Sequence, residues 1–354
     1  EVALSMMRRE EERLGCVAWY GKGEVDWAVA LWSRREYHES FDVGSAEIEL
    51  FDAGHILGSA MIKCVRNNRS ILFTGDLGNS PEPLLNDTEI PAGVNYLIME
   101  SVYGDRVHEN REHRRDILRA AIVDAQARKG TLLIPSFSLE RTQILLFEIS
   151  DMVEKGELAA LPVFLDSPLA IRATDVFRRY THLLNADAQG RFADGVDAFA
   201  FPGLHVTATT AQARTIHNAP DPKVIIAGAG MSVGGRIRAH EARYLPDPNA
   251  SILFVGYQTP GSLGRRIQEG SKDVTIDGAR VQVRARTQSL TGYSGHRDRD
   301  GLLDFVEHLG SPLERVFVVM GEPKAEMFLS QRIRDFLGVR AEAPTDSSTV
   351  TIEW

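Results

Sequence analysis

The sequence has few cysteines, no long apolar run and no excess of basic charge. Cys16 and Cys64 stand alone without a Cys-x-x-Cys pair, as is typical of a protein from a reducing cytoplasm in which both thiols are packing residues. Apolar stretches such as 251–256 are far shorter than the roughly 18 residues needed to cross a membrane. The first residues lack the layout of a secretory signal peptide. We therefore expect a soluble cytoplasmic protein with no membrane partner.

The charge balance excludes some classes of protein. The 354 residues contain 40 Lys and Arg against 49 Asp and Glu, a formal charge of −9, and 43% of the residues are apolar. This composition excludes a disordered or collagen-like chain. It also disfavours a protein that coats nucleic acid non-specifically, although a locally basic cleft is compatible with it. The length predicts about two domains, each able to bury a core.

The order of apolar patterns predicts an α/β protein. Residues 1–40 are predicted to be helical. Short strands are predicted at 46–51, 60–65, 70–74 and 95–99. After a charged helix that ends near residue 128, predicted strands alternate with helices, including 142–153 and 237–244; these strands are 131–134, 162–165, 224–227 and 251–255. Such alternation favours a mostly parallel α/β layer. The predicted elements that follow are strands 274–276, 281–286 and 315–319 and helices 301–309 and 324–337.

Four polar residues lie where apolar strands end: His55, Asp76, Glu100 and His296. Ligands of α/β sheets collect at strand ends. Imidazole and carboxylate groups suit Zn²⁺, and an acid–imidazole pair can transfer protons. Taken singly, each residue has an ordinary structural explanation, because an Asp in a Gly-Asp-x-Gly turn usually bonds its own backbone. Their joint occurrence in Gly-rich loops predicts a shared site.

Six segments in order carry a family resemblance. They are Asp52-Ala-Gly-His-Ile-Leu-Gly-Ser59, Phe73-Thr-Gly-Asp-Leu-Gly78, Met99-Glu-Ser-Val-Tyr-Gly-Asp-Arg106, Ile134-Pro-Ser-Phe-Ser-Leu-Glu-Arg-Thr-Gln143, Ala227-Gly-Ala-Gly-Met-Ser-Val-Gly-Gly-Arg236 and Gly292-Tyr-Ser-Gly-His296. With these segments the sequence resembles the β-CASP branch of the metallo-β-lactamase fold. It is most similar to RNA-processing nucleases related to the cleavage-polyadenylation endonuclease subunit. The resemblance runs from about residue 40 to the end of the sequence.

The resemblance implies a role for each of the four polar residues. His55 matches a zinc-binding His of the family, and Asp76 matches the Asp that bridges two zinc ions. Glu100 matches the acid of the Glu-Ser-Thr-Tyr-Gly motif, with Val102 in place of Thr, and the family pairs this acid with a His, here His296. Asp76, Glu100 and His296 are therefore the expected catalytic residues. His55 and Asp76 are the expected metal ligands.

A second group of residues is predicted to contact substrate phosphate: Arg141, Ser167, Arg236, Ser294 and His108. Both Arg residues follow a strand end or a Gly-rich turn. Each of these residues also has a structural alternative. The two Arg side chains are equally compatible with solvated or salt-bridged positions, Ser167 with a turn and His108 with packing.

The sequence departs from the family in two places. The motif His-x-His-x-Asp-His does not occur in the 354 residues, which suggests the downstream part of a longer gene product or a protein that has lost the motif. Met320 occupies the position before Gly-Glu at which the RNA nucleases have a His ligand of the second zinc. A thioether is a poor substitute for imidazole at zinc. We expect well under one zinc per molecule and impaired activity for this chain.

Three alternatives remain open at this stage. A dinucleotide-binding enzyme is one, because Val224-Ile-Ile-Ala-Gly228-Ala-Gly230-Met-Ser-Val-Gly234 is a strand followed by Gly-x-Gly, but its third Gly is one residue late. A second is a non-catalytic β-CASP protein that binds nucleic acid or acts as a scaffold. A third is a nuclease of the same family that acts on DNA.

The expected fold is an αββα metallo-β-lactamase sandwich that lacks its first part and contains an inserted α/β β-CASP domain. The expected segments are 1–107 and 273–354 for the sandwich and 108–272 for the insertion. The expected function is zinc-dependent hydrolysis of RNA phosphodiester bonds, in RNA processing or decay, with single-stranded RNA among the partners. Endonuclease and exonuclease action both remain open, and so does a homodimer.

Overall fold

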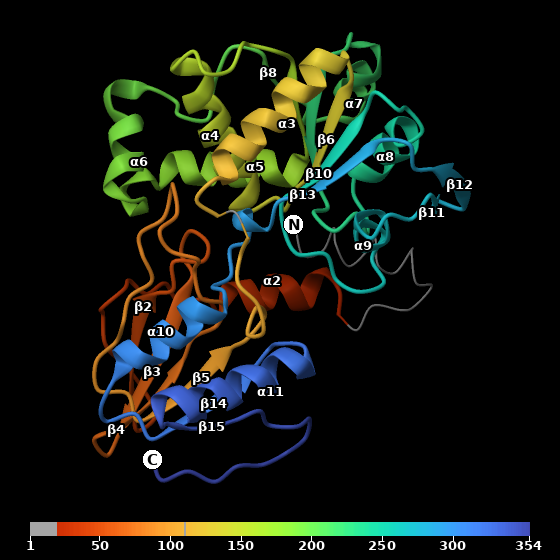
Figure 1. Ribbon diagram of the computed structural model, residues 1–354. Helices are drawn as coiled ribbons and strands as arrows, with labels where there is room; N and C mark the ends of the chain where they lie inside the picture. Colours follow the sequence, from red (N-terminus) through yellow and green to blue (C-terminus); the bar gives the residue numbers. More distant parts are fainter. Residues whose placement is uncertain (1–19, 110) are drawn as a thin grey trace.

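Two separate β-sheets, each with its own helices, dominate the computed structural model, which describes residues 20–109 and 111–354 (Figure 1). One sheet has seven strands in the order β1-β2-β3-β4-β5-β14-β15, and the other has six in the order β13-β10-β6-β9-β7-β8. A two-stranded hairpin, β11 (Asp273–Ile276) and β12 (Ala279–Gln282), stands beside the six-stranded sheet. No helix in the described part of the chain is both long and apolar enough to span a bilayer.

The seven-stranded sheet combines an antiparallel half and a parallel half. Its strands are β1 (Phe41–Val43), β2 (Ala46–Asp52), β3 (Ala60–Arg66), β4 (Arg69–Phe73), β5 (Tyr96–Glu100), β14 (Arg315–Val319) and β15 (Arg340–Glu342). β1 to β4 pair antiparallel, whereas β4, β5, β14 and β15 pair parallel. The ends of the parallel strands β4, β5 and β14 therefore point to the same edge, which faces the other sheet (Figure 1).

Helices cover one face of this sheet. α10 (Arg299–Leu309) and α11 (Pro323–Arg332) bury Phe305 and Leu329 against Leu72, Leu97 and Val318. On the opposite face a small cluster of apolar strand residues packs against Ile352 and Trp354 from the end of the chain. The described residues thus contain one β-layer with an α-layer on one face.

The six-stranded sheet is parallel throughout and has helices on both faces. Its strands are β6 (Thr131–Pro135), β7 (Val163–Asp166), β8 (Leu204–Val206), β9 (Lys223–Ala227), β10 (Ser251–Phe254) and β13 (Arg286–Ser289). Its helices are α3 (Arg114–Arg128), α4 (Arg141–Glu154), α5 (Pro168–Arg179), α6 (Ala186–Arg191), α7 (Thr210–Thr215), α8 (Ile237–Tyr244) and α9 (Leu263–Gln268). One core lies under α3, α4 and α5 and another under α8 and α9. Apolar strands buried on both faces are typical of parallel α/β sheets.

The bounds of some predicted strands and helices differ from the observed ones. The predicted strand 281–286 is divided between β12 and β13, because the chain turns at Val283 and Arg284 to bond Lys272 and Leu245. The helix predicted to end at residue 337 is α11 followed by a π-helical turn, Ile333–Leu337. Of the helices predicted for residues 1–40, only α2 (Lys22–Ala30) falls in the described chain, and residues 1–19 lie outside it.

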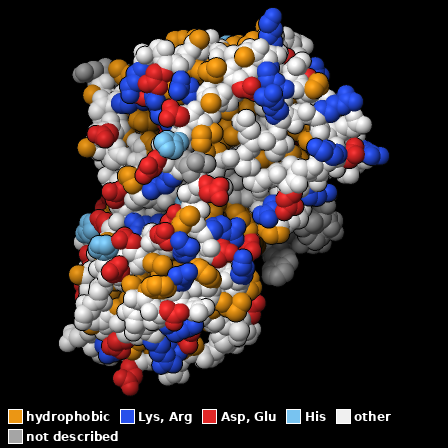
Figure 2. Space-filling model, in the orientation of Figure 1, with side chains coloured by type: hydrophobic (Ala, Val, Ile, Leu, Met, Phe, Trp, Pro, Cys, Tyr) orange, Lys and Arg blue, Asp and Glu red, His pale blue; other side chains and the backbone are white. Residues whose placement is uncertain are grey.

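A buried ionic network joins the two layers. Arg114 of α3 contacts Glu82, which follows β4, with Nη2 and Oε2 3.0 Å apart, and its Nε lies 3.5 Å from Glu148 of α4. Glu148 also accepts a hydrogen bond from the hydroxyl of Tyr293. All four side chains are buried. At the surface, by contrast, the face shown in Figure 2 has acidic and basic side chains interspersed over both layers.

Candidate active site

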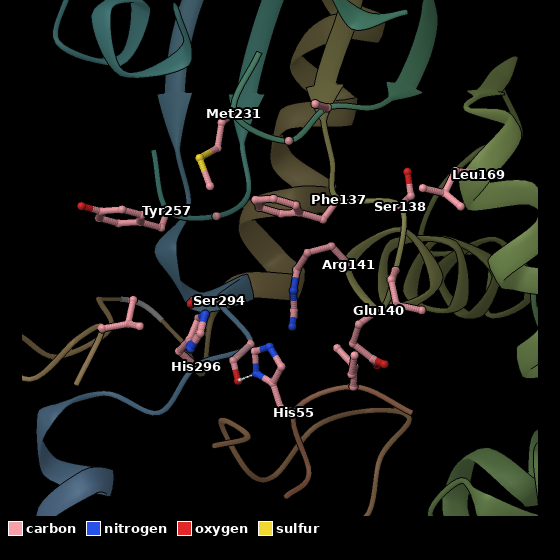
Figure 3. Close-up of a pocket in the computed structure, with 17 residues that line it drawn as sticks. His55, Phe137, Ser138, Glu140, Arg141, Leu169, Met231, Tyr257, Ser294 and His296 are labelled. Carbon is pink, nitrogen blue, oxygen red and sulfur yellow. Dashed lines mark hydrogen bonds between the residues drawn. The ribbon is translucent and has the colours of Figure 1, made fainter. Parts of the chain in front are cut away.

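A pocket of about 520 Å³ lies where the ends of the strands of the two sheets meet. His55, His296 and the tip of Arg141 gather at one end of it, and Phe137, Met231 and Tyr257 at the other (Figure 3). Ligand pockets typically hold about 300–1,000 Å³ and combine apolar walls with a few polar groups. This pocket fits that description.

His55 lies in the loop that follows β2. Its Nδ1 lies 3.1 Å from the carbonyl oxygen of Gly295, which leaves Nε2 to face Asp76, with 3.7 Å between Nε2 and Oδ2. Burial, and then the charge of His296, lowers the pKa of His55 to about 4. The imidazole is therefore neutral at pH 7, the form that binds a metal.

Asp76 follows β4 and brings a carboxylate to the same point. One side-chain atom each from His55, Asp76 and His296 lie within 4.8 Å of one another. Two imidazole nitrogens and a carboxylate oxygen form a donor set that suits zinc, whose catalytic sites use three protein ligands and an open position. The residues present therefore fit a metal ion. The sequence predicted two ligands here, and the structure adds His296 to the group.

Glu100 and His296 form a buried pair. Nδ1 of His296 lies 3.0 and 3.1 Å from the two carboxylate oxygens of Glu100, which is fully buried at the end of β5. The same carboxylate accepts a hydrogen bond of 2.6 Å from the backbone N–H of Leu77. Burial alone would lower the pKa of His296, but the hydrogen bond and the charge of Glu100 outweigh it and raise the pKa above its ordinary value. His296 thus keeps its proton at higher pH than His55 does.

Main-chain contacts hold the loops of the two histidines together. Gly78, after β4, pairs with His296 in an isolated β-bridge, and the N–H of Asn79 donates to the carbonyl of Gly295 at 2.9 Å. A Cβ on Gly78 would lie 2.0 Å from the carbonyl oxygen of Gly54, so no other residue fits there without a backbone shift. Gly78 is therefore a close-approach position.

Arg141 begins α4 and extends toward the histidines (Figure 3). The side chain is 5% exposed, and its Nη1 has no hydrogen-bond partner among the described residues. Burial lowers its pKa from the ordinary value of Arg. The preceding residue, Glu140, is also buried, and burial raises its pKa to about 8. A buried, unpaired guanidinium at a pocket is suited to an anionic ligand.

Comparisons with known proteins agree with this geometry. Residues 142–267 match the Beta-Casp domain, and residues 280–344 match the Zn-dependent metallo-hydrolase RNA specificity domain. The chain is 34% identical to Ribonuclease TTHA0252 of Thermus thermophilus, a match that covers 88% of this chain and 71% of the relative. The chain belongs to the β-CASP family of metallo-β-lactamase-fold RNA nucleases.

More distant β-CASP relatives are archaeal. The chain is 31% identical to the transcription termination factor FttA of Pyrococcus abyssi, over 90% of this chain and 50% of that protein. Identity to FttA of Methanothermobacter thermautotrophicus is 28%, over 99% of this chain and 56% of that protein. The chain therefore spans about half the length of these factors. The match to the Zn-dependent metallo-hydrolase RNA specificity domain indicates that this chain uses a metal ion.

Not all the residues with a predicted phosphate contact reach the pocket. Arg141 and Ser294 line it. Arg236 instead pairs with Asp166 at 2.7 Å. The hydroxyl of Ser167 accepts the N–H of Ala170 at the start of α5. His108 lies behind the site, where its Nε2 is 2.9 Å from the carbonyl oxygen of His296.

Met320 lies outside the metal cluster, with a side chain 58% exposed and a backbone φ of +64°. Its effect on a second metal therefore stays a prediction. Sequence reasoning did not assign most of the other lining residues to the site, among them Phe137, Glu140 and Tyr257. Phe137 and Glu140 lie within the segment Ile134–Gln143 that carried the resemblance, so their closeness in sequence to Arg141 was the available sign that they belong to the site.

Proposed function

We propose that the pocket is the active site of a zinc-dependent enzyme that hydrolyses RNA phosphodiester bonds. One observation carries the proposal: His55, His296 and the unpaired guanidinium of Arg141 line a single pocket, with Asp76 3.7 Å from His55 and Glu100 3.0 Å from His296. These groups are a metal-binding set, a proton donor and an anion-binding group, which phosphodiester hydrolysis requires. Membership of the β-CASP family supports RNA as the substrate.

The proposed metal ligands in this chain are His55 and Asp76; His296 lies in the same cluster but is assigned to proton transfer, because a protonated imidazole does not bind a metal. When bound, zinc supplies positive charge near the reacting phosphate and acidifies water. We propose two zinc ions for a protein with the complete family ligand set. We propose partial zinc occupancy for the 354 residues as given, because they contain no His-x-His-x-Asp-His motif.

The other residues act directly on the substrate. Arg141 binds a non-bridging oxygen of the phosphate through its planar fork, assisted by Ser294. The Glu100–His296 pair holds a proton on the imidazole, and Nε2 passes it to the departing oxygen of the ribose. The hydrogen bond and the charge of Glu100 outweigh the effect of burial and raise the pKa of His296, which favours the protonated form that a proton donor needs. General-acid catalysis of this kind contributes roughly 10²–10⁴-fold.

We propose that residues 1–107 and 273–354 form the metallo-β-lactamase domain and residues 108–272 the inserted β-CASP domain. The two-sheet organisation supports this division over residues 41–254, but not its second boundary. The third segment contributes β13 to the six-stranded sheet before it enters the seven-stranded sheet as β14. A cytoplasmic location is supported by the unpaired thiol of Cys64. A homodimer stays a prediction.

A chimera that places the family's His-x-His-x-Asp-His segment before Glu1 tests the proposed function. We expect it to cleave labelled RNA when zinc is added, and we expect His296→Ala and Asp76→Asn to lower the rate by roughly 10²-fold or more. Arg236→Ala is the matched control, because this Arg is paired outside the pocket. A folded, zinc-loaded chimera that leaves RNA intact would contradict the proposal.

Met320 favours a second candidate, a β-CASP protein that binds RNA without cutting it. The same chimera distinguishes the two, because the second candidate predicts RNA binding with no cleavage at any zinc concentration. A DNA strand of the same sequence is the further comparison. Cleavage of that DNA at the rate measured for RNA would favour the DNA-directed alternative.

A further inference from the structure

Phe137 presents an aromatic ring to the apolar end of the pocket. It lies between β6 and α4, and 38% of its surface is exposed. Its carbonyl accepts a hydrogen bond of 2.8 Å from the hydroxyl of Thr142, which fixes the backbone that carries the ring. Phe137 is thus a partly exposed aromatic side chain on a fixed backbone at the wall of a pocket.

The ring lies against the backbone of two glycines. A Cβ on Gly230 would lie 2.8 Å from a ring carbon of Phe137, and one on Gly256 would lie 3.6 Å from the ring. Only a residue without a side chain lets the backbone approach an aromatic ring this closely. One side of Phe137 is therefore supported by main chain, and the rest of the ring faces the pocket (Figure 3).

The loop that supports the ring is itself well anchored. The buried side chain of Gln258 donates from Nε2 to the carbonyl of Gly230 at 2.9 Å, and the N–H of Gly264 donates to the carbonyl of Met231 at 3.2 Å. The hydroxyl of Ser232 donates to the buried carboxyl of Glu241. The supported ring is thus preorganised, which lowers the entropy cost of binding a flat ligand against it.

Phe137 and Arg141 are four residues apart and line the same pocket. Arg141 is nine-tenths buried with an unpartnered nitrogen, so a phosphate bound there would place its nucleoside within reach of the ring above. The other aromatic side chain of the pocket is less available. The hydroxyl of Tyr257 bonds Glu322, and its ring meets Tyr103 edge-on at 5.9 Å.

We propose that Phe137 is a stacking platform for a nucleobase of single-stranded RNA, next to the phosphate held by Arg141. This inference rests on the proposed function and adds a specificity-determining residue to it. Every base has a π face, so a stacking platform binds all four bases and selects for unpaired over paired RNA. The inference therefore assigns the preference for single strands to one side chain.

Binding of the 354-residue chain to fluorescein-labelled single-stranded RNA tests the inference. The readout is fluorescence anisotropy, with EDTA present to prevent cleavage. Phe137→Leu keeps an apolar side chain but removes the π face. We expect it to weaken binding by about 5- to 150-fold, the range that stacking of one base on an aromatic ring covers. Phe137→Trp should restore affinity. Phe336→Leu is the matched control, because Phe336 is 66% exposed and is not among the residues that line the pocket, and we expect little change.

A series of RNAs, each with one abasic nucleotide, separates stacking from general packing. At one position, loss of the base should weaken binding to the original chain and leave binding to Phe137→Leu unchanged. If Phe137→Leu binds RNA as tightly as the original chain, or if Phe137→Trp fails to restore binding, the inference is overturned while the proposed function stands. If the original chain does not bind RNA at all, both fail.

Discussion

Replacement of Glu100 by Gln tests the electrostatics of the site. Gln keeps an oxygen for the N–H of Leu77 but places a neutral amide against Nδ1 of His296. In the original chain this contact is a charge-assisted hydrogen bond between a fully buried carboxylate and an imidazole that is 24% exposed. Such bonds contribute about 1.5–3 kcal/mol, against about 0.5–1.5 for neutral ones, so the substitution should destabilise the fold by about 1–2 kcal/mol while His296 is charged.

The pH dependence gives the sign of the effect. Because the pKa of His296 is raised in the folded state, the stabilisation is fully present below the ordinary His pKa of about 6.5 and is lost as pH rises through the folded value. Glu100→Gln should therefore cost most near pH 6 and little near pH 9. Urea unfolding at the two pH values measures the difference. An NMR titration of His296 should show a lower pKa in the variant.

A surface pair provides the matched control for Glu100→Gln. Glu89 lies 3.0 Å from His38, but both side chains are substantially exposed, so Glu89→Gln should change stability by less than about 1 kcal/mol at either pH. A Glu100→Gln cost that is the same at both pH values would refute the reasoning. So would a variant in which the pKa of His296 stays raised.

Three further predictions concern the metal, the phosphate contact and the backbone. Asp76→Asn removes the carboxylate of the metal-binding set and should weaken zinc binding more than roughly tenfold. The zinc affinity is measured by competition between the protein and a coloured chelator. An unchanged affinity would exclude Asp76 as a ligand. Arg141→Lys keeps the charge but loses the planar fork, so RNA affinity at low salt should fall roughly tenfold, and equal affinity would show that no phosphate binds there. Gly78→Ala should destabilise the fold by about 1–3 kcal/mol in urea unfolding, because the added Cβ would overlap the carbonyl of Gly54. Gly234→Ala should be nearly neutral, because nothing lies within 4 Å of a Cβ at that position. Equal costs for the two variants would contradict the contact.

The positions of the strand ends could be predicted from the sequence because they depend on short stretches of neighbouring residues. Asp76 and Glu100 directly follow apolar runs, and parallel pairing of β4 with β5 brings their strand ends to one edge. The place of His296 depended on the family resemblance, since it is almost 200 residues from Glu100 in the sequence. Helix α8 was also predicted with its observed bounds, because its start and end lie in polar turns.

Long-range pairing could not be read in the same way. Arg141 and Arg236 follow similar turns, yet only Arg141 reaches the pocket. The partner of Arg236 is Asp166, 70 residues earlier, and nothing local in the sequence indicates that pair. The division of the predicted strand 281–286 has the same origin, because backbone bonds from Val283 and Arg284 to distant carbonyls decide where the strand breaks.

The bond between Tyr257 and Glu322 joins the six-stranded layer to the loop after β14. The Tyr hydroxyl keeps its proton at neutral pH, because burial and the neighbouring carboxylate raise its pKa to about 12. Glu322 is exposed, so the bond is worth less than about 1 kcal/mol. The two layers are therefore held together at this point by a bond weak enough to break without unfolding either of them.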